Sequence, residues 1–300
     1  MPGSVEAGQA GSAEERLMER ILVGVDGSSH SLHALRWAAG LAEHAGLELV
    51  AGRVYVPTET QLAEAVGKGP ALREEHLAEL RQWCESLAGG CPTRDCVLLD
   101  GEPPEALIDG AKQRGADMLV VGARGAGGFA HLLIGSVAHQ LTRHTTLPLA
   151  VVPPSAGLAI DRLVVGNEGS QGGAAAVDLA ADLAPLLEVP VTAVYAYDPK
   201  AEDRPLGDPP QWHAQAEERV LGWAAPITRT GTALDVYVDH DPNCHPVPAL
   251  EHALEQHPGS VAVLGTRGRG GFLGLRLGRV PIQLIDSTSH AIILVPVPTL

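Results

Sequence analysis

Short apolar runs alternate with longer stretches of mixed polarity along most of the chain. Runs rich in Val, Leu and Ile are typical of buried β-strands, whereas the stretches between them repeat their apolar residues at helical spacing. In the first half of the chain, strands are predicted over 21–25, 47–56, 96–99, 117–121 and 147–152.

The stretch that follows the first predicted strand has a helical pattern over residues 28–46. Its apolar residues recur at helical spacing, and Ser28 or Ser29 is suited to cap its N-terminus. Further helices are predicted over about 72–87, over 104–115 with prolines at the start, and from Ser136 onward.

Two segments recur in the same order later in the chain. ILVGVDGS at 21–28 returns as LVVGNEGS at 163–170, an offset of 142, and GARGAGGFAHLLIGSVA at 122–138 returns as GTRGRGGFLGLRLGRVP at 265–281, an offset of 143. One domain is therefore duplicated in tandem. The predicted parts are a disordered tail over 1–18, a first domain over 19–153, a linker over 154–160 and a second domain over 161–300.

Alternation of strand and helix predicts the fold class. Parallel strands joined by right-handed helical crossovers form an α/β sheet covered on both faces. We expect two tandem doubly wound α/β domains, each an open, mostly parallel five-stranded sheet in the order 3-2-1-4-5 with helices on both faces.

Composition excludes several classes of function. The net charge of −15, without a Lys/Arg cluster, argues against a nucleic-acid partner. The apolar runs are far shorter than the roughly 20 residues that span a bilayer, so we expect no membrane contact and a cytoplasmic protein. Cysteines at 84, 91, 96 and 244 lack CxxC spacing, so they are expected to be inert thiols, and no metal site is predicted.

The segment 122–138 is rich in glycine and directly follows an apolar strand. Glycines permit positive φ and a close approach of backbone to ligand, and Ser136 is expected to cap the next helix, whose N-terminus favours an anion. Asp26 follows the first strand and would face the same crevice if the two strands are neighbours. A phosphate cradle with a carboxylate at its far end suits a nucleotide. The loop is not a Walker loop, because no Gly-Lys-Ser/Thr follows.

These residues carry a family resemblance. The pattern Gly-x2-Gly-x9-Gly-Ser, with Asp26 and the strand LPLAVV, resembles the universal stress protein family in its tandem form. For ATP-binding members the resemblance implies that Asp26 and Gly122 hold the ribose, and that the backbone at Val54 meets the adenine. It also implies that the phosphates, with any Mg²⁺ that accompanies them, are held by Gly125, Gly135 and Ser136. Arg124 either adds charge to the phosphates or is merely solvated.

The second copy departs from this pattern at two positions. Asn167 is taken to replace the aspartate, which removes a charged acceptor, and Arg279 replaces the serine. The guanidinium either pairs with a phosphate or fills the site itself, and impairment is the favoured interpretation. The backbone cradle would be kept by the glycines of the second loop, Gly265, Gly268 and Gly278.

The resemblance also implies a function and an assembly. We expect an ATP-binding, nucleotide-sensing regulatory module of the stress response without dedicated catalysis, since no general base or dedicated Mg²⁺ ligand is recognisable. The alternatives are a nucleotide-free interaction or scaffold protein and a slow ATPase. In the family the last strands pair, so LPLAVV and AIILVPV should join the halves into an internal pseudo-dimer, and two chains are expected to pair further as a homodimer.

Overall fold

The computed structural model describes residues 18–56, 69–87, 93–125, 134–196, 209–239, 245–268 and 277–297. Except for Met18, which is buried in the core, the predicted tail lies outside this part of the chain. The first half contains β1 (Arg20–Gly24), α1 (Ser29–Ala45), β2 (Glu48–Tyr55), α3 (Gly69–Glu85), β3 (Thr93–Asp100), α4 (Pro103–Gln113), β4 (Met118–Gly122), α5 (Ser136–His144) and β5 (Leu149–Val152). The second contains β6 (Arg162–Gly166), α6 (Gln171–Leu187), β7 (Val191–Ala196), α7 (Pro209–Trp223), α8 (Ala225–Arg229), β8 (Leu234–Asp239), α9 (Pro246–Glu255), β9 (Ser260–Gly265), α10 (Arg279–Ser287) and β10 (Ile292–Val295).

All ten strands belong to one sheet with the order β3-β2-β1-β4-β5-β10-β9-β6-β7-β8. Within each half every pairing is parallel, and the second half repeats the strand order of the first. The predicted fold class and the order 3-2-1-4-5 are therefore confirmed.

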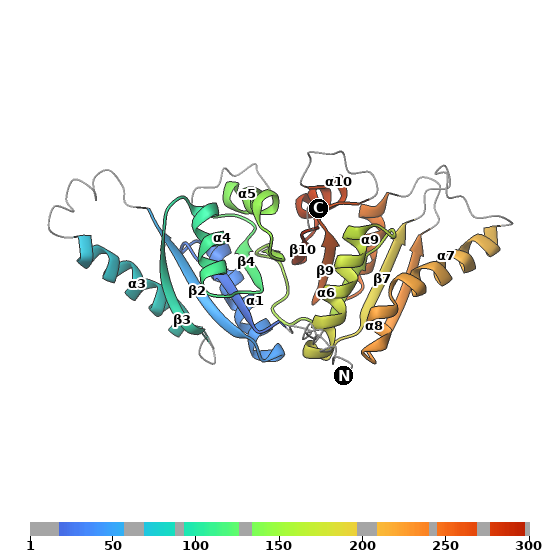
Figure 1. The fold of residues 1–300 in the computed structure, drawn as a ribbon, viewed down its shortest axis with the longest axis horizontal. Helices are drawn as coiled ribbons and strands as arrows, with labels where there is room; N and C mark the ends of the chain where they lie inside the picture. Colours follow the sequence, from blue (N-terminus) through green and yellow to red (C-terminus); the bar gives the residue numbers. More distant parts are fainter. Residues whose placement is uncertain are drawn as a thin grey trace, which may run out of the picture.

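The last strands of the two halves join them. β10 pairs with β5 in the antiparallel direction, with Ile293 opposite Ala150 at the centre of the register. This pairing relates the halves as an internal pseudo-dimer and turns two five-stranded sheets into one of ten strands (Figure 1). Both strands are fully buried, so the join is part of the core.

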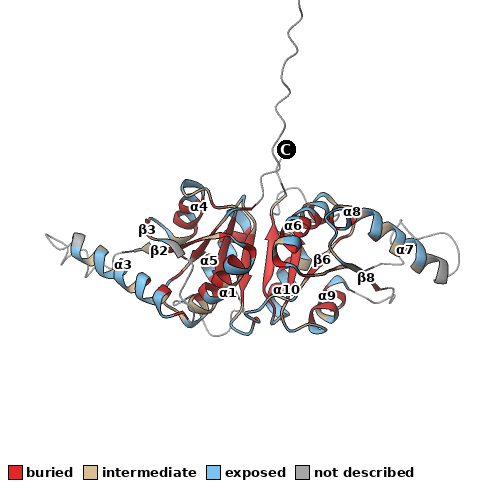
Figure 2. Cartoon of the chain, turned by 90° about the horizontal axis from the view of Figure 1, so that it is seen from below, coloured by how far each residue is buried: buried red, intermediate tan, exposed pale blue. Residues whose placement is uncertain are grey.

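Helices cover both faces of the sheet, and the strands between them are buried (Figure 2). On one face a single hydrophobic cluster extends across both halves beneath α1, α3, α6, α7 and α8. On the other face there are two clusters, one under α4 and α5 and one under α9 and α10. The halves therefore share a core on one face and keep their own on the other.

Local sequence signals explain where several helices begin and end. Ser28 is the N-cap of α1, and its side chain accepts a hydrogen bond from the N–H of Ser31, as predicted for one of the two serines. Gly46 ends the helix in the left-handed region, with φ +67°. Pro103 opens α4, where its missing N–H costs no helical hydrogen bond.

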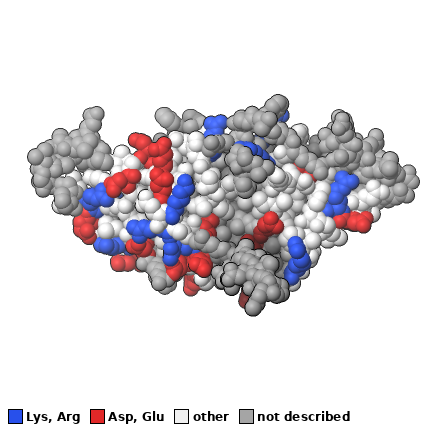
Figure 3. Space-filling model, in the orientation of Figure 1, with Lys and Arg blue, Asp and Glu red and all other residues white. Residues whose placement is uncertain are grey.

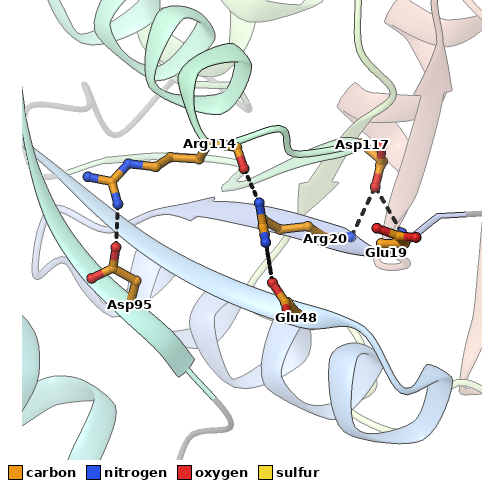
Figure 4. A network of polar contacts seen from close by, with 6 residues as sticks. All are labelled: Glu19, Arg20, Glu48, Asp95, Arg114 and Asp117. Atoms are coloured by element: carbon orange, nitrogen blue, oxygen red, sulfur yellow. Dashed lines mark hydrogen bonds and ion pairs between the residues drawn. The ribbon is translucent and has the colours of Figure 1, made fainter.

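The amino ends of the first domain's strands are fastened by a polar network (Figure 4). One carboxylate oxygen of Asp117 accepts the backbone N–H of Arg20 at 3.0 Å, and Arg20 Nε donates to Glu48 at 2.8 Å. Arg20 also donates to the backbone oxygen of Arg114, whose side chain pairs with Asp95. These contacts join the amino ends of β1 and β2 to the segment before β4, at the edge opposite the carboxyl ends of the strands.

Surface charges are mixed. On the face drawn in Figure 3, acidic and basic side chains are interspersed over the first domain. In the described part of the chain no helix is long and apolar enough to cross a membrane, and no three His, Cys, Asp or Glu side chains are placed to hold a metal ion. Cys84 and Cys96 are thiols whose sulfur atoms lie 3.6 Å apart, and the other two cysteines lie outside the described residues.

Candidate functional site

The strand order of the first domain reverses between β1 and β4, because β1 pairs with β2 on one side and with β4 on the other. Beyond the carboxyl ends of these strands lies a cavity of about 350 Å³. Each residue predicted for the first site borders this one cavity: Asp26, Val54, Gly122, Arg124, Gly125, Gly135 and Ser136.

Asp26 has two roles, one for each carboxylate oxygen. Oδ1 accepts the backbone N–H of Ser28 at 3.0 Å, and the backbone N–H of Asp26 donates to Ser31 Oγ at 3.2 Å. Oδ2 lies 2.6 Å from the position that a Cβ would take at Gly125. The turn therefore fixes the carboxylate, and the second oxygen faces the backbone of the glycine loop.

For the described glycines of the loop, one part of the prediction is wrong, and the structure adds a second reason for glycine. Gly122, Gly125 and Gly135 do not adopt positive φ, so that expectation is wrong for these three. A Cβ at Gly122 would lie 2.8 Å from the backbone C and O of His30 at the start of α1, closer than real Cβ contacts allow. These glycines allow the chain to pack closely against itself, and residues 126–133 of the loop lie outside the described part.

The start of α5 also differs from the prediction. The N-cap is Gly135 and Ser136 is the first helical residue, so the expectation that Ser136 caps the helix is wrong. The N–H of Gly135 donates to Ala123 O at 2.7 Å, and the first helical hydrogen bond runs from His139 N to Gly135 O. The N–H groups of residues 136–138 therefore have no partner within the helix, as at any helix start, and the cavity is bordered by all three residues.

The remaining wall of the cavity is apolar and was not predicted in detail. It is formed by side chains of β4, α4 and the residue before Gly135, namely Val121, Leu107 and Ile134, together with Pro103. An apolar wall, a carboxylate and backbone N–H groups in one cavity suit a ligand with a flat apolar part, hydroxyl groups and an anionic part. The α4 contribution becomes visible only when the helix is placed over the sheet.

His30 lies beside the charged groups of the site. Burial and the positive charge of Arg124 lower the pKa of His30, while the negative charge of Asp26 acts in the opposite direction. His30 is therefore neutral at neutral pH. Among the described residues that line the first cavity, the charged side chains are Asp26 and Arg124.

A corresponding cavity of about 520 Å³ lies at the carboxyl ends of β6 and β9. It is bordered by all five residues predicted for the second copy: Asn167, Gly265, Gly268, Gly278 and Arg279. α5 and α10, whose first residues border the two cavities, lie along the same upper side of the molecule in Figure 1.

The match between Asn167 and Asp26 is wrong by one residue. Val25 N donates to Gly52 O in the first half, and Asn167 N donates to Val194 O in the second, so Asn167 corresponds to buried Val25. The glycines that follow agree, since Gly27 and Gly169 both have positive φ.

Glu168 is therefore the counterpart of Asp26. A shift of one residue along a strand turns a side chain to the other face of the sheet, which is why chemical likeness between Asn and Asp misleads here. The Asn167 side chain is buried, and its Oδ1 accepts the N–H of Gly169 at 2.8 Å. The second copy has not lost its carboxylate.

The sequence model described as the universal stress protein family matches the chain twice, over residues 18–153 and 159–296. A universal stress protein of Mycolicibacterium smegmatis is 28% identical over 293 residues, covering 92% of this chain and 96% of that protein. One of Mycobacterium tuberculosis is 28% identical over 279 residues, covering 87% of this chain and 90% of that protein.

A solved structure has a similar fold. The crystal structure of a universal stress protein from Archaeoglobus fulgidus matches with a TM-score of 0.66 and 20% sequence identity, covering 93% of this chain and 98% of that chain. The likeness therefore extends through both halves.

Proposed function

Because the chain belongs to the universal stress protein family, we propose that its first domain binds ATP and that the protein is a nucleotide-sensing regulatory module of a stress response in the cytoplasm. The observation that carries the proposal is the position of Asp26. Its Oδ2 faces the glycine loop within a cavity that is also bordered by the first residues of α5. A carboxylate accepts ribose hydroxyls, and N–H groups at a helix start favour phosphate oxygens.

The size and lining of the cavity agree with this ligand. About 350 Å³ falls within the range of small-molecule sites, and the apolar wall from Val121, Leu107 and Ile134 is suited to a purine ring. In this assignment the backbone at Val54 meets the adenine, and Gly125, Gly135 and Ser136 surround the phosphates. Gly135 contributes shape, because its own N–H is held by Ala123.

The same lining favours binding over turnover. Of the described residues that line the cavity, Asp26 is the only carboxylate, and in this proposal it holds ribose hydroxyls. Phosphoryl transfer needs a group that positions the nucleophile and ligands that hold the metal ion. Any Mg²⁺ would therefore enter with the nucleotide, and we assign no catalytic residue.

Calorimetric titration of the nucleotide-stripped full chain with ATP tests the proposal. Asp26→Ala removes the charged acceptor, and a hydrogen bond to a charged group is worth about 1.5–3 kcal/mol, so affinity at the first site should fall about 10- to 150-fold. Asp109→Ala, an exposed carboxylate on α4 outside the cavity, is the matched control and should bind like the parent chain. Equal affinities and stoichiometries for the two variants would refute the assignment of Asp26.

A further inference from the structure

The second cavity keeps a carboxylate in the place that Asp26 occupies in the first. Glu168 Oε1 lies 2.6 Å from the position that a Cβ would take at Gly268, and Asp26 Oδ2 lies 2.6 Å from the corresponding position at Gly125. The longer glutamate therefore brings an oxygen to the same point above the same glycine.

This oxygen of Glu168 needs a donor. It is buried, and no described residue donates a hydrogen bond to it. A buried acceptor without a donor is unfavourable, and more so when it is charged. A ligand hydroxyl in the cavity would supply the missing hydrogen bond.

The lining of the second cavity has gained positive charge. Arg279 takes the position of Ser136 as first residue of its helix, and Arg267 takes that of Arg124. The two arginines and Glu168 give a formal charge of +1 (two positive, one negative), against zero for Arg124 and Asp26. Pro281 replaces Ala138 and removes one N–H from the helix start, so the second cavity has one backbone anion donor fewer and one guanidinium more than the first.

The apolar part of the lining has similar residue types in the two cavities. Leu250 and Leu264 take the places of Leu107 and Val121, and Leu277 takes that of Ile134. The second cavity is the larger of the two, about 520 Å³ against about 350 Å³. Nothing in the described lining closes it to a ligand of the size expected in the first.

We propose that the second cavity is a nucleotide site in its own right, in which Glu168 accepts the ribose hydroxyls and Arg279 pairs with phosphate. The inference rests on the proposed function of the first domain and replaces the expectation that the second site is impaired. The proposal also implies that the two sites hold phosphate with different groups. The first holds phosphate mainly with backbone N–H groups, whereas the second holds it with a guanidinium, so the second should depend more strongly on the phosphates of its ligand.

The test titrates ATP and adenosine into the full chain in the Asp26→Ala background, where the second site is isolated. Glu168→Gln removes the charge at nearly constant shape, and Glu168→Asp restores the residue type of the first site. Asn167→Val is the matched control, because it installs the residue that the first domain has at that position. Arg279→Ser installs the residue that the first domain has at the first position of the corresponding helix, and it tests the proposed contact with phosphate. Circular dichroism establishes that each variant is folded.

We expect the parent chain to bind two ATP and the Asp26→Ala chain to keep one tight site. Glu168→Gln in that background should weaken ATP and adenosine alike, by about 10- to 100-fold, whereas Asn167→Val and Glu168→Asp should keep the affinity within about threefold. Arg279→Ser should weaken ATP by about 10- to 100-fold and leave adenosine unchanged.

Three outcomes would overturn the inference. One site in the parent chain and none after Asp26→Ala would leave the first-domain proposal standing and show that the second cavity binds no ATP. Tighter ATP binding by Arg279→Ser would show that the guanidinium fills the site. Loss of binding in Asn167→Val, with Glu168→Gln unaffected, would assign the ribose to Asn167. No binding by the parent chain would instead refute the proposed function itself.

Discussion

Gly27 offers a sharp test of the packing beside the first site. It follows Asp26, has φ +83°, and an added Cβ would lie 2.7 Å from two ring atoms of Trp83. Real Cβ atoms do not come so close, so Gly27→Ala must move the ring as well as strain the backbone. The ring is held in place by the Arg53 guanidinium, which lies 4.7 Å from the ring centroid.

Two other glycines separate these effects. Gly46 and Gly231 have φ +67° and +79°, and an added Cβ at either would meet nothing within 4 Å. Alanine at these two positions should therefore show only the cost of the left-handed conformation, about 1–2 kcal/mol. Gly27→Ala adds an overpacking cost of about 1–3 kcal/mol, for a total of about 2–5 kcal/mol.

Urea unfolding followed by circular dichroism measures these costs as shifts of the midpoint at constant slope. The same change in a Trp83→Ala background should cost only the conformational part, because the ring is gone, which makes a double-mutant cycle. The reasoning is refuted if Gly27→Ala costs no more than Gly46→Ala, or if removal of the ring leaves its cost unchanged.

Two further predictions concern stability. Gly122→Ala places a Cβ 2.8 Å from backbone atoms of His30 and should destabilise the chain by about 1–3 kcal/mol. Gly222→Ala lies on an open face of α7 and should instead stabilise the chain by about 0.5–1 kcal/mol. Equal urea midpoints for the two variants would contradict this prediction. Burial lowers the pKa of His290 below its ordinary 6.5, while contact with the backbone of His257 opposes the shift. The unfolded chain then binds more protons than the folded chain, so the melting temperature should fall as the pH drops below about 6.5. In His290→Gln the melting temperature should fall less steeply. Parallel curves of melting temperature against pH for the two chains, from pH 7.5 to 5.5, would exclude a contribution of His290 to this pH dependence.

The sequence predicted the sheet well because the succession of strands and helices follows from local alternation. Each apolar run is flanked by an amphipathic helix, and crossovers of one hand leave few arrangements. The pairing of β5 with β10 was also expected, from the family resemblance, and the antiparallel register of Ile293 with Ala150 confirms it.

The site was harder to predict because its details depend on contacts between distant elements. Ser136 appeared suited to cap α5, but the backbone places Gly135 at the N-cap, where Ala123 holds its N–H. Asn167 is predicted to replace Asp26, but both the repeat offset of 142 and the hydrogen-bond register between strands assign that place to Glu168. The sequence does carry the signal for this position, because the repeat alignment already places Glu168 opposite Asp26, whereas residue types alone do not decide the N-cap of α5.

A comparison of the two halves distinguishes the packing role of the glycine motif from the role of the side chains that would bind a ligand. A Cβ at Gly265 would lie 2.3 Å from the backbone of Gly172, just as one at Gly122 would strike the backbone of His30. Both copies therefore need glycine at this strand end to pack against the start of the first helix of their half, α1 or α6, with or without a nucleotide. Survival of the motif in the second half shows only that the fold is kept. The ligand preference must be set by the side chains that differ, and those with the largest change in polar chemistry are the carboxylate of Glu168, which is longer than that of Asp26, and the guanidinium of Arg279 in place of the Ser136 hydroxyl.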